Sequence, residues 1–86
     1  MKMADVIIPV YNERENLPLL WQRLQALTIC QQLHFIFVDN ASTDGSAEYL
    51  AALPSITLIQ HANNRGYGAS LRSGMQAAQT ERWIIL

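Results

Sequence analysis

The sequence predicts an α/β fold in which a parallel sheet is covered by helices on both faces. Short apolar runs rich in branched side chains alternate with longer segments of helical spacing, which is typical of repeated βα units. The apolar runs are continuous rather than alternating, as expected of parallel strands that are buried on both faces. Strict alternation of four strands with three helices then indicates parallel pairing through right-handed crossovers.

Each element follows from its own pattern. The expected strands span residues 5–9, 35–38, 56–59 and 83–86, and the expected helices begin at residue 17, span residues 46–53 and span residues 69–79. In the first helix the apolar side chains fall on one stripe: Leu17, Leu20, Trp21, Leu24 and Leu27. Pro18 fits the first turn of this helix, with Asn16 as the expected N-cap residue. We expect Ser42 and Asp44 to cap the second helix.

Composition and charge exclude several classes of protein. The 86 residues are 50% apolar and carry a net charge of −1, which allows one modest core. The near-even charge balance gives no basic surface for nucleic acid or an anionic membrane, and no apolar stretch approaches the roughly 18 residues of a membrane span. The single cysteine, Cys30, excludes an internal disulfide and favours a reducing, cytoplasmic location. His34 and His61 stand without a partner cluster, so we expect neither to be catalytic.

Three polar loops follow the first three strands. The carboxyl ends of parallel strands meet at one edge of the sheet, where α/β folds bind ligands. The loop after the first strand contains no glycine, which excludes the dinucleotide-binding Gly-x-Gly-x-x-Gly motif, and the Gly-Lys-Ser/Thr of a P-loop is also absent. The remaining polar side chains could stack on a base, accept its hydrogen bonds or bind a diphosphate: Tyr11, Asn12, Glu13, Asp39, Asn40, Asp44, Asn64 and Arg65.

Three segments together carry a resemblance to a known family: VIIPVYNE at residues 6–13, FVDNASTDGS at residues 37–46 and NRGYGA at residues 64–69. In this order and at these separations they resemble the first three motifs of family 2 glycosyltransferases, which are inverting enzymes with the GT-A fold. The resemblance covers nearly the whole chain. It implies a Rossmann-like half-domain of three α/β/α layers, with the four strands in the order 3-2-1-4.

The resemblance also implies a donor, a uridine or guanosine diphosphate sugar. It places four residues of the first motif beside the base and ribose: Pro9, Tyr11, Asn12 and Glu13. Asp39 would contact the base, and Asn64, Arg65 and Gly66 would lie near the phosphates. The glycine-rich third segment resembles that of members which transfer sugars to polyprenyl or dolichyl phosphate. A polyprenyl phosphate or a glycan is therefore the expected acceptor.

In this family a metal-binding Asp-x-Asp follows the fourth strand, where this sequence reaches Leu86, and the catalytic base lies further on. We therefore expect residues 1–86 to be the N-terminal donor-binding portion of a longer enzyme, inactive alone. Mg²⁺ or Mn²⁺ would bind only in the full enzyme, at the cytoplasmic face of a membrane. The alternative is a truncated, non-catalytic module that binds nucleotide or self-associates through its unfinished sheet. A nucleotidyltransferase is disfavoured, because those enzymes place a glycine-rich basic loop after the first strand.

Overall fold

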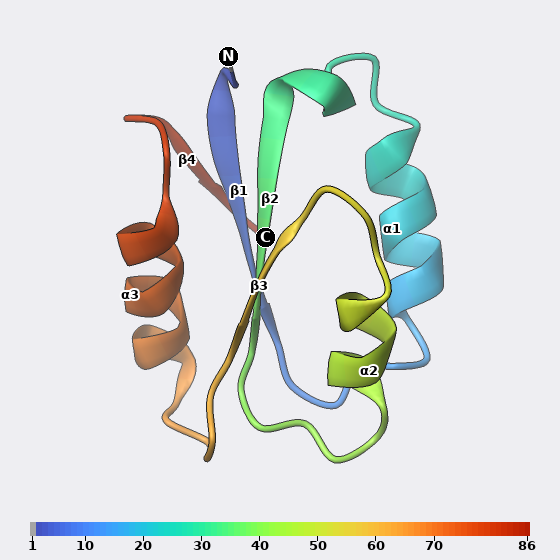
Figure 1. Cartoon of the computed structure of the whole chain (residues 1–86), viewed down its shortest axis with the longest axis vertical. Helices are drawn as coiled ribbons and strands as arrows, with labels where there is room; N and C mark the ends of the chain where they lie inside the picture. Colours follow the sequence, from blue (N-terminus) through green and yellow to red (C-terminus); the bar gives the residue numbers. More distant parts are fainter. Residues whose placement is uncertain (1) are drawn as a thin grey trace.

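The computed structural model describes residues 2–86 as a four-stranded sheet between two layers of helices (Figure 1). The elements in chain order are β1 (Ala4–Val10), α1 (Leu17–Gln25), a short 3-10 helix (Cys30–Gln32), β2 (Leu33–Asp39), α2 (Ser46–Ala51), β3 (Thr57–Gln60), α3 (Tyr67–Ala77) and β4 (Trp83–Ile85). All strand pairs are parallel, in the order β3-β2-β1-β4. The expected α/β class and strand order are confirmed.

The continuous apolar strands serve two separate cores. Successive side chains of a strand point to opposite faces of the sheet. Val6 and Ile8 of β1 therefore join the core under α1 and α2, while Ile7 points to the other face, with Ile36 and Val38 of β2, under α3. Both faces of β1 and β2 are covered, which explains why neither strand shows an alternating pattern.

Helix α3 lies unusually close to β1. A Cβ atom placed on Gly74 would lie 2.5 Å from Cγ2 of the fully buried Ile7, closer than any side chain could be accommodated without movement. Glycine at this position therefore lets the helix backbone rest directly on the strand. Leu71 and Met75 pack on either side of this contact.

The structure also corrects the predicted stripe of α1. Leu17 and Leu24 are buried as expected, but the helix ends at Gln25, and Leu27 is exposed. The N–H of Leu27 donates to the carbonyl of Leu24, three residues back, so the chain tightens and leaves the α-helical path. Asn16 occupies the N-cap position, as predicted, without a side-chain hydrogen bond to the helix.

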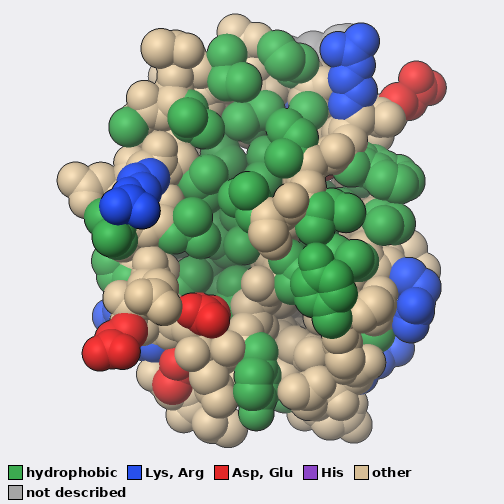
Figure 2. All heavy atoms as spheres, turned by 180° about the vertical axis from the view of Figure 1, so that it is seen from behind, with side chains coloured by type: hydrophobic (Ala, Val, Ile, Leu, Met, Phe, Trp, Pro, Cys, Tyr) green, Lys and Arg blue, Asp and Glu red, His purple; other side chains and the backbone are tan. Residues whose placement is uncertain are grey.

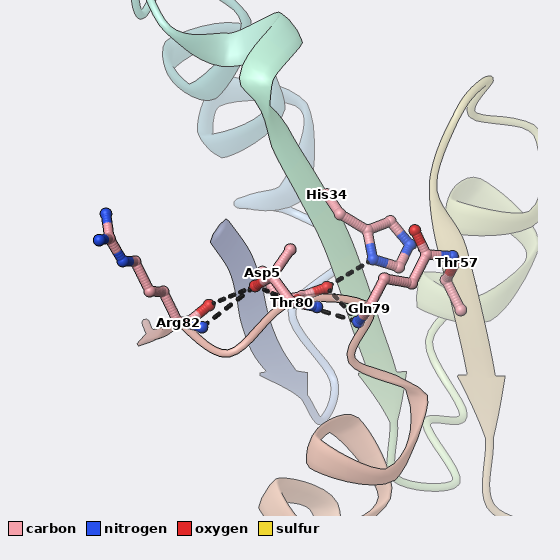
Figure 3. Close-up of polar contacts among 6 residues, drawn as sticks. All are labelled: Asp5, His34, Thr57, Gln79, Thr80 and Arg82. Atoms are coloured by element: carbon pink, nitrogen blue, oxygen red, sulfur yellow. Dashed lines mark hydrogen bonds and ion pairs between the residues drawn. The ribbon is translucent and has the colours of Figure 1, made fainter. Parts of the chain in front are cut away.

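A buried hydrogen-bond network surrounds Asp5 at the amino edge of the sheet (Figure 3). Its carboxylate accepts from the N–H groups of Gln79 and Thr80, from the Thr80 hydroxyl at 2.6 Å and from Nδ1 of His34 at 2.7 Å. Nε2 of His34 lies 2.7 Å from Oγ1 of Thr57. The prediction that His34 has no partner is wrong, because this network joins β1 to β2, β3 and the turn before β4.

The partners of Asp5 also determine its charge state. Burial alone would raise the pKa of the Asp5 carboxyl, but hydrogen bonds from the Thr80 hydroxyl, the Gln79 N–H and His34 outweigh that effect. The pKa of Asp5 therefore lies below its ordinary value. Since the carboxylate can only accept, Nδ1 of His34 carries the proton on that side.

The β4 edge of the sheet is apolar and open. Figure 2 shows hydrophobic side chains gathered over this edge, between the two helical layers. We call it the β4 edge patch; four consecutive side chains of it, each 42–52% exposed, are Trp83, Ile84, Ile85 and Leu86. No helix within residues 2–86 is long and apolar enough to cross a membrane.

Candidate functional site

The candidate site lies at the carboxyl edge of the sheet, at the bottom of the view in Figure 1. Three loops meet there: residues 11–16 after β1, residues 40–45 after β2 and residues 61–66 after β3. The backbone joins them directly, because the N–H of Asn40 donates to the carbonyl of Val10 and the N–H of His61 donates to that of Asp39. This is the edge at which parallel α/β sheets bind their ligands.

The first two loops are fastened to each other by hydrogen bonds. Three consecutive backbone N–H groups, those of residues 12–14, donate to side chains of the second loop and of the first residue of α2: Oγ of Ser42 at 2.9 Å, Oγ of Ser46 at 3.1 Å and Oδ2 of Asp44 at 3.0 Å. In return, the N–H of Thr43 donates to Oδ1 of Asn12 at 2.8 Å. The side-chain amide oxygen of Asn12 therefore binds the second loop. The backbone of Asn12 itself is in the left-handed region (φ 52°).

Ser42 and Asp44 differ from the expected helix caps. The N-cap of α2 is Gly45 (φ 93°), and it makes no side-chain capping bond. The hydroxyl of Ser42 instead accepts from the N–H of Asn12 in the first loop. Asp44 accepts from both the N–H and the hydroxyl of Ser46, the first residue of α2. Hydrogen bonds from the Ser46 hydroxyl and from backbone N–H groups lower the pKa of the Asp44 carboxyl, against a smaller opposing effect of burial.

Asp39 is the most distinctive polar residue of the site. It is the last residue of β2 rather than the first of the loop, and it is 2% exposed. Its Oδ2 accepts from the N–H of Ser42 at 3.2 Å, whereas its buried Oδ1 finds no hydrogen-bond partner anywhere in residues 2–86. A buried acceptor without a donor is costly, by about 1–3 kcal/mol. Asp39 is one of the residues that line a cavity of about 510 Å³, together with Gln60 and His61.

A second cavity, of about 310 Å³, is lined by Asn40, the residue that follows Asp39. Its lining includes five of the predicted site residues: Pro9, Tyr11, Glu13, Asn64 and Gly66. The sequence reasoning did not select Tyr67 and Ser70, which also line it. Tyr67 is 61% exposed and Tyr11 49% exposed, so two accessible aromatic rings border this cavity. The signal that could have found Tyr67 is its place between two glycines at the start of a helix.

Two arginines lie near the start of α3. The side chain of Arg65 is exposed and does not belong to the lining of either cavity described for residues 2–86. A Cβ atom placed on Gly68 would lie 3.4 Å from Nη1 of Arg72, so this guanidinium reaches back over the first turn of α3. The guanidinium of Arg72 therefore lies near the N-terminus of α3, which is the positive end of the helix dipole.

A divalent cation does not fit the residues of this site. Within the part of the chain that the structure describes, no three His, Cys, Asp or Glu side chains come together in a way that could hold a metal ion. The acidic residues of the site serve other groups: Asp44 is engaged by Ser46 and Arg14, and Oε2 of Glu13 accepts from the amide of Asn16.

The strand order, the two helical layers and the cavities at the carboxyl edge define an α/β domain of Rossmann-like, GT-A half-domain architecture. The sequence model of the family described as "Glycosyl transferase family 2" matches residues 5–86. The chain therefore belongs to glycosyl transferase family 2.

Among its relatives is the undecaprenyl-phosphate 4-deoxy-4-formamido-L-arabinose transferase of Aeromonas hydrophila, which is 36% identical over 100% of this chain and 28% of the relative. The polyprenol monophosphomannose synthase of Mycolicibacterium smegmatis is 40% identical over 94% of this chain and 32% of that protein. The chain thus spans about a third or less of the length of these relatives.

A solved structure supports the fold. The mannosyltransferase PcManGT from Pyrobaculum calidifontis, in complex with GDP-Man and Mn²⁺, superposes with a TM-score of 0.77 at 25% identity. The match covers 88% of this chain and 24% of the mannosyltransferase.

Proposed function

We propose that this chain binds the nucleoside diphosphate part of a sugar donor, a UDP- or GDP-sugar, for an inverting glycosyltransferase. The observation that carries the proposal is the buried carboxylate of Asp39: its Oδ1 has no donor within residues 2–86, and the residue is part of the lining of a cavity. Uracil and guanine each carry a ring N–H that could donate to this oxygen, whereas the corresponding ring nitrogens of cytosine and adenine only accept. The orphaned oxygen therefore favours uridine or guanosine.

The neighbouring groups supply the rest of such a site. The exposed ring of Tyr11 can stack on a base, and the carboxylate of Glu13 can accept from ribose hydroxyls. The first N–H groups of α3 have no partner within the helix and point toward its N-terminus, where a diphosphate would be stabilised. Arg65 and Arg72 add positive charge near this end, although only Arg72 is placed against the helix by its contact with Gly68.

For the whole protein we propose a polyprenyl phosphate acceptor, supported by its similarity to an undecaprenyl-phosphate sugar transferase and to a polyprenol monophosphomannose synthase. An acceptor phosphate oxygen would attack the anomeric carbon from the side opposite the nucleoside diphosphate, which leaves with the electrons of the broken bond. A divalent cation would be bound only in the full-length protein, since the carboxylates of residues 2–86 form no site for it. We propose that the reaction takes place at the cytoplasmic face of a membrane.

Calorimetry with nucleoside diphosphates tests the proposed base contact. We expect UDP or GDP to bind the chain more tightly than CDP and ADP, and Asp39→Asn to weaken the preferred nucleotide by about 10- to 100-fold, the value of a hydrogen bond to a charged group. Asparagine keeps the shape of the side chain but replaces the negatively charged carboxylate with a neutral amide. Glu15→Gln, an exposed acid of the first loop outside both cavities, is the matched control and should bind as the wild type does. Equal affinities of the wild type and Asp39→Asn would contradict the proposal.

The β4 edge patch supports a second candidate, self-association of the chain through its sheet edge. β4 pairs with β1 on one side only, and its apolar side chains are exposed, which is the usual setting for edge-to-edge pairing. Size-exclusion chromatography over a range of concentrations should then show dimers, and Ile84→Lys should abolish them. Leu19→Lys, which changes an equally exposed apolar residue of α1, should not. A wild type that elutes as a monomer at every concentration would exclude this candidate.

A further inference from the structure

The side-chain amide of Asn40 connects the end of β2 to the loop before α3. Two backbone donors determine its orientation. The N–H of Arg65 donates to Oδ1 of Asn40 at 2.9 Å, so the amide oxygen must face that N–H. The N–H of Gly66 donates to Oδ1 of Asn64 at 2.9 Å, which fixes the second amide in the same way. Nδ2 of Asn40 then donates to Oδ1 of Asn64 at 2.8 Å, as donor to acceptor.

His61 extends this arrangement to the middle of α3. Its Nδ1 lies 3.0 Å from Oδ1 of Asn40, which is an acceptor, so Nδ1 carries a proton. Its Nε2 lies 2.8 Å from Oγ of Ser73. The expectation that His61 has no partner is therefore wrong. Asn40 accepts from the two ends of the 61–66 loop, at His61 and Arg65, and donates to Asn64 between them.

A carboxylate at position 40 could not replace this amide. It would place an acceptor against Oδ1 of Asn64. Rotating the Asn64 amide to offer its NH₂ group would restore that contact, but Gly66 would then lose its acceptor. Gly66 is the N-cap of α3 and has φ 88°, so its position determines where the first free N–H groups of the helix point.

We propose that Asn40 is a positioning residue for the diphosphate: its amide, rather than any contact of its own with the ligand, holds residues 61–66 so that the N-terminus of α3 faces the bound phosphates. The inference rests on the proposed donor binding. Asp39 lines the other cavity, which the Asn40 amide reaches only through His61, whereas Arg65 and Asn64 bond to this amide directly. Loss of Asn40 should therefore weaken binding of the diphosphate end of the ligand more than binding of the base.

Comparing the affinity for UDP with that for uridine distinguishes effects on the diphosphate from effects on the base. If the chain prefers guanine, GDP and guanosine are compared instead. We expect Asn40→Asp and the uncharged Asn40→Leu each to weaken the nucleoside diphosphate about tenfold and to weaken the nucleoside clearly less. Asn63→Asp, like Asn40→Asp, adds one negative charge, but it lies on an exposed residue of the 61–66 loop and leaves the amides of Asn40 and Asn64 unchanged. This variant should bind both ligands as the wild type does. Thermal unfolding of each variant reports whether it is folded.

A double-mutant cycle supplies the second measurement. Asn64→Ala alters an exposed residue and leaves the core intact, and it should cause the same selective loss. The double variant Asn40→Leu/Asn64→Ala should lose less than the sum of the two single losses, since the two residues share the bond from Nδ2 of Asn40 to Oδ1 of Asn64. Unchanged diphosphate affinity, an equal loss for nucleoside and nucleotide, or additive losses would each overturn the inference. A wild type that binds neither ligand would refute the proposed function itself, and the inference with it.

Discussion

Replacing Asp5 with asparagine is expected to lower the free energy of unfolding by about 3–5 kcal/mol, the usual cost of removing one partner of a buried charged pair, because the side chain of Asp5 is fully buried. The total stability of a small domain is about 5–15 kcal/mol, so the loss would be a large fraction of it. All the groups that surround the carboxylate are donors, namely the N–H groups of Gln79 and Thr80, the Thr80 hydroxyl and the His34 ring. Asparagine would turn an NH₂ group toward one of them and leave it unpaired.

The same substitution should change how stability depends on pH. Because the folded protein lowers the pKa of Asp5, the carboxylate stabilises the fold fully above its unfolded pKa, near 3.8, and this contribution is lost as the pH falls through the lower folded value. Urea unfolding at pH 7 and at successively lower pH should therefore show the wild type and Asp5→Asn converging below about pH 4. Glu81→Gln removes an exposed acid beside the same turn and is the control. A constant difference at every pH would contradict the assigned role of the charge.

Phe37→Ala is expected to cost about 3–5 kcal/mol, as is usual for removing a fully buried aromatic ring. Phe37 lies at the centre of β2, is 1% exposed, and its ring meets that of Trp21 edge to face at a centroid distance of 5.9 Å. The cavity left behind would lie between the sheet and α1, where Trp21 also contacts Phe35. Neither the sheet nor the helix can close this gap without disturbing the other pair of rings.

Chemical denaturation of Phe37→Ala and Phe37→Leu measures this contribution. Leucine retains most of the volume, so the loss should fall to less than about 1.5 kcal/mol. Phe37 is two residues before Asp39 on the same strand, so the variants also report on the site. If Phe37→Leu were as unstable as Phe37→Ala, the interaction between the rings, rather than the filled volume, would dominate at this position.

The continuity of the apolar runs, together with their alternation with helical segments, predicted the parallel sheet, in which Ile7 and Ile8 of one strand are both buried. The order of strands and helices also predicted that the loops carrying Tyr11, Glu13 and Asn64 would meet at one edge of the sheet, and in the structure these three residues line one cavity. The ends of the elements were less predictable. Asp39 and Leu33 belong to β2 because pairing with β1 extends over them, and polar or flanking residues give no local sign of that pairing.

The two histidines show what the sequence could not reveal. In the sequence, no cluster of polar partners marks His34 or His61. In the structure, each is buried and hydrogen-bonded through both ring nitrogens. Their partners are distant in the chain: Asp5 is 29 residues from His34, and Asn40 is 21 residues from His61. Such contacts depend on strand register, which is set only when the whole sheet has formed.

The strand order has a consequence for synthesis on the ribosome. β1 emerges first but lies inside the sheet, and its neighbour β4 emerges last. Asp5 and Thr80, which share the shortest bond of the amino-edge network, are 75 residues apart. At a translation rate of about 5–20 residues per second, a charged group destined for the interior stays without its final partners for roughly 4 to 15 s. The nascent chain therefore spends seconds with this strand half covered, and its fold is completed only after the end of α3 has left the exit tunnel.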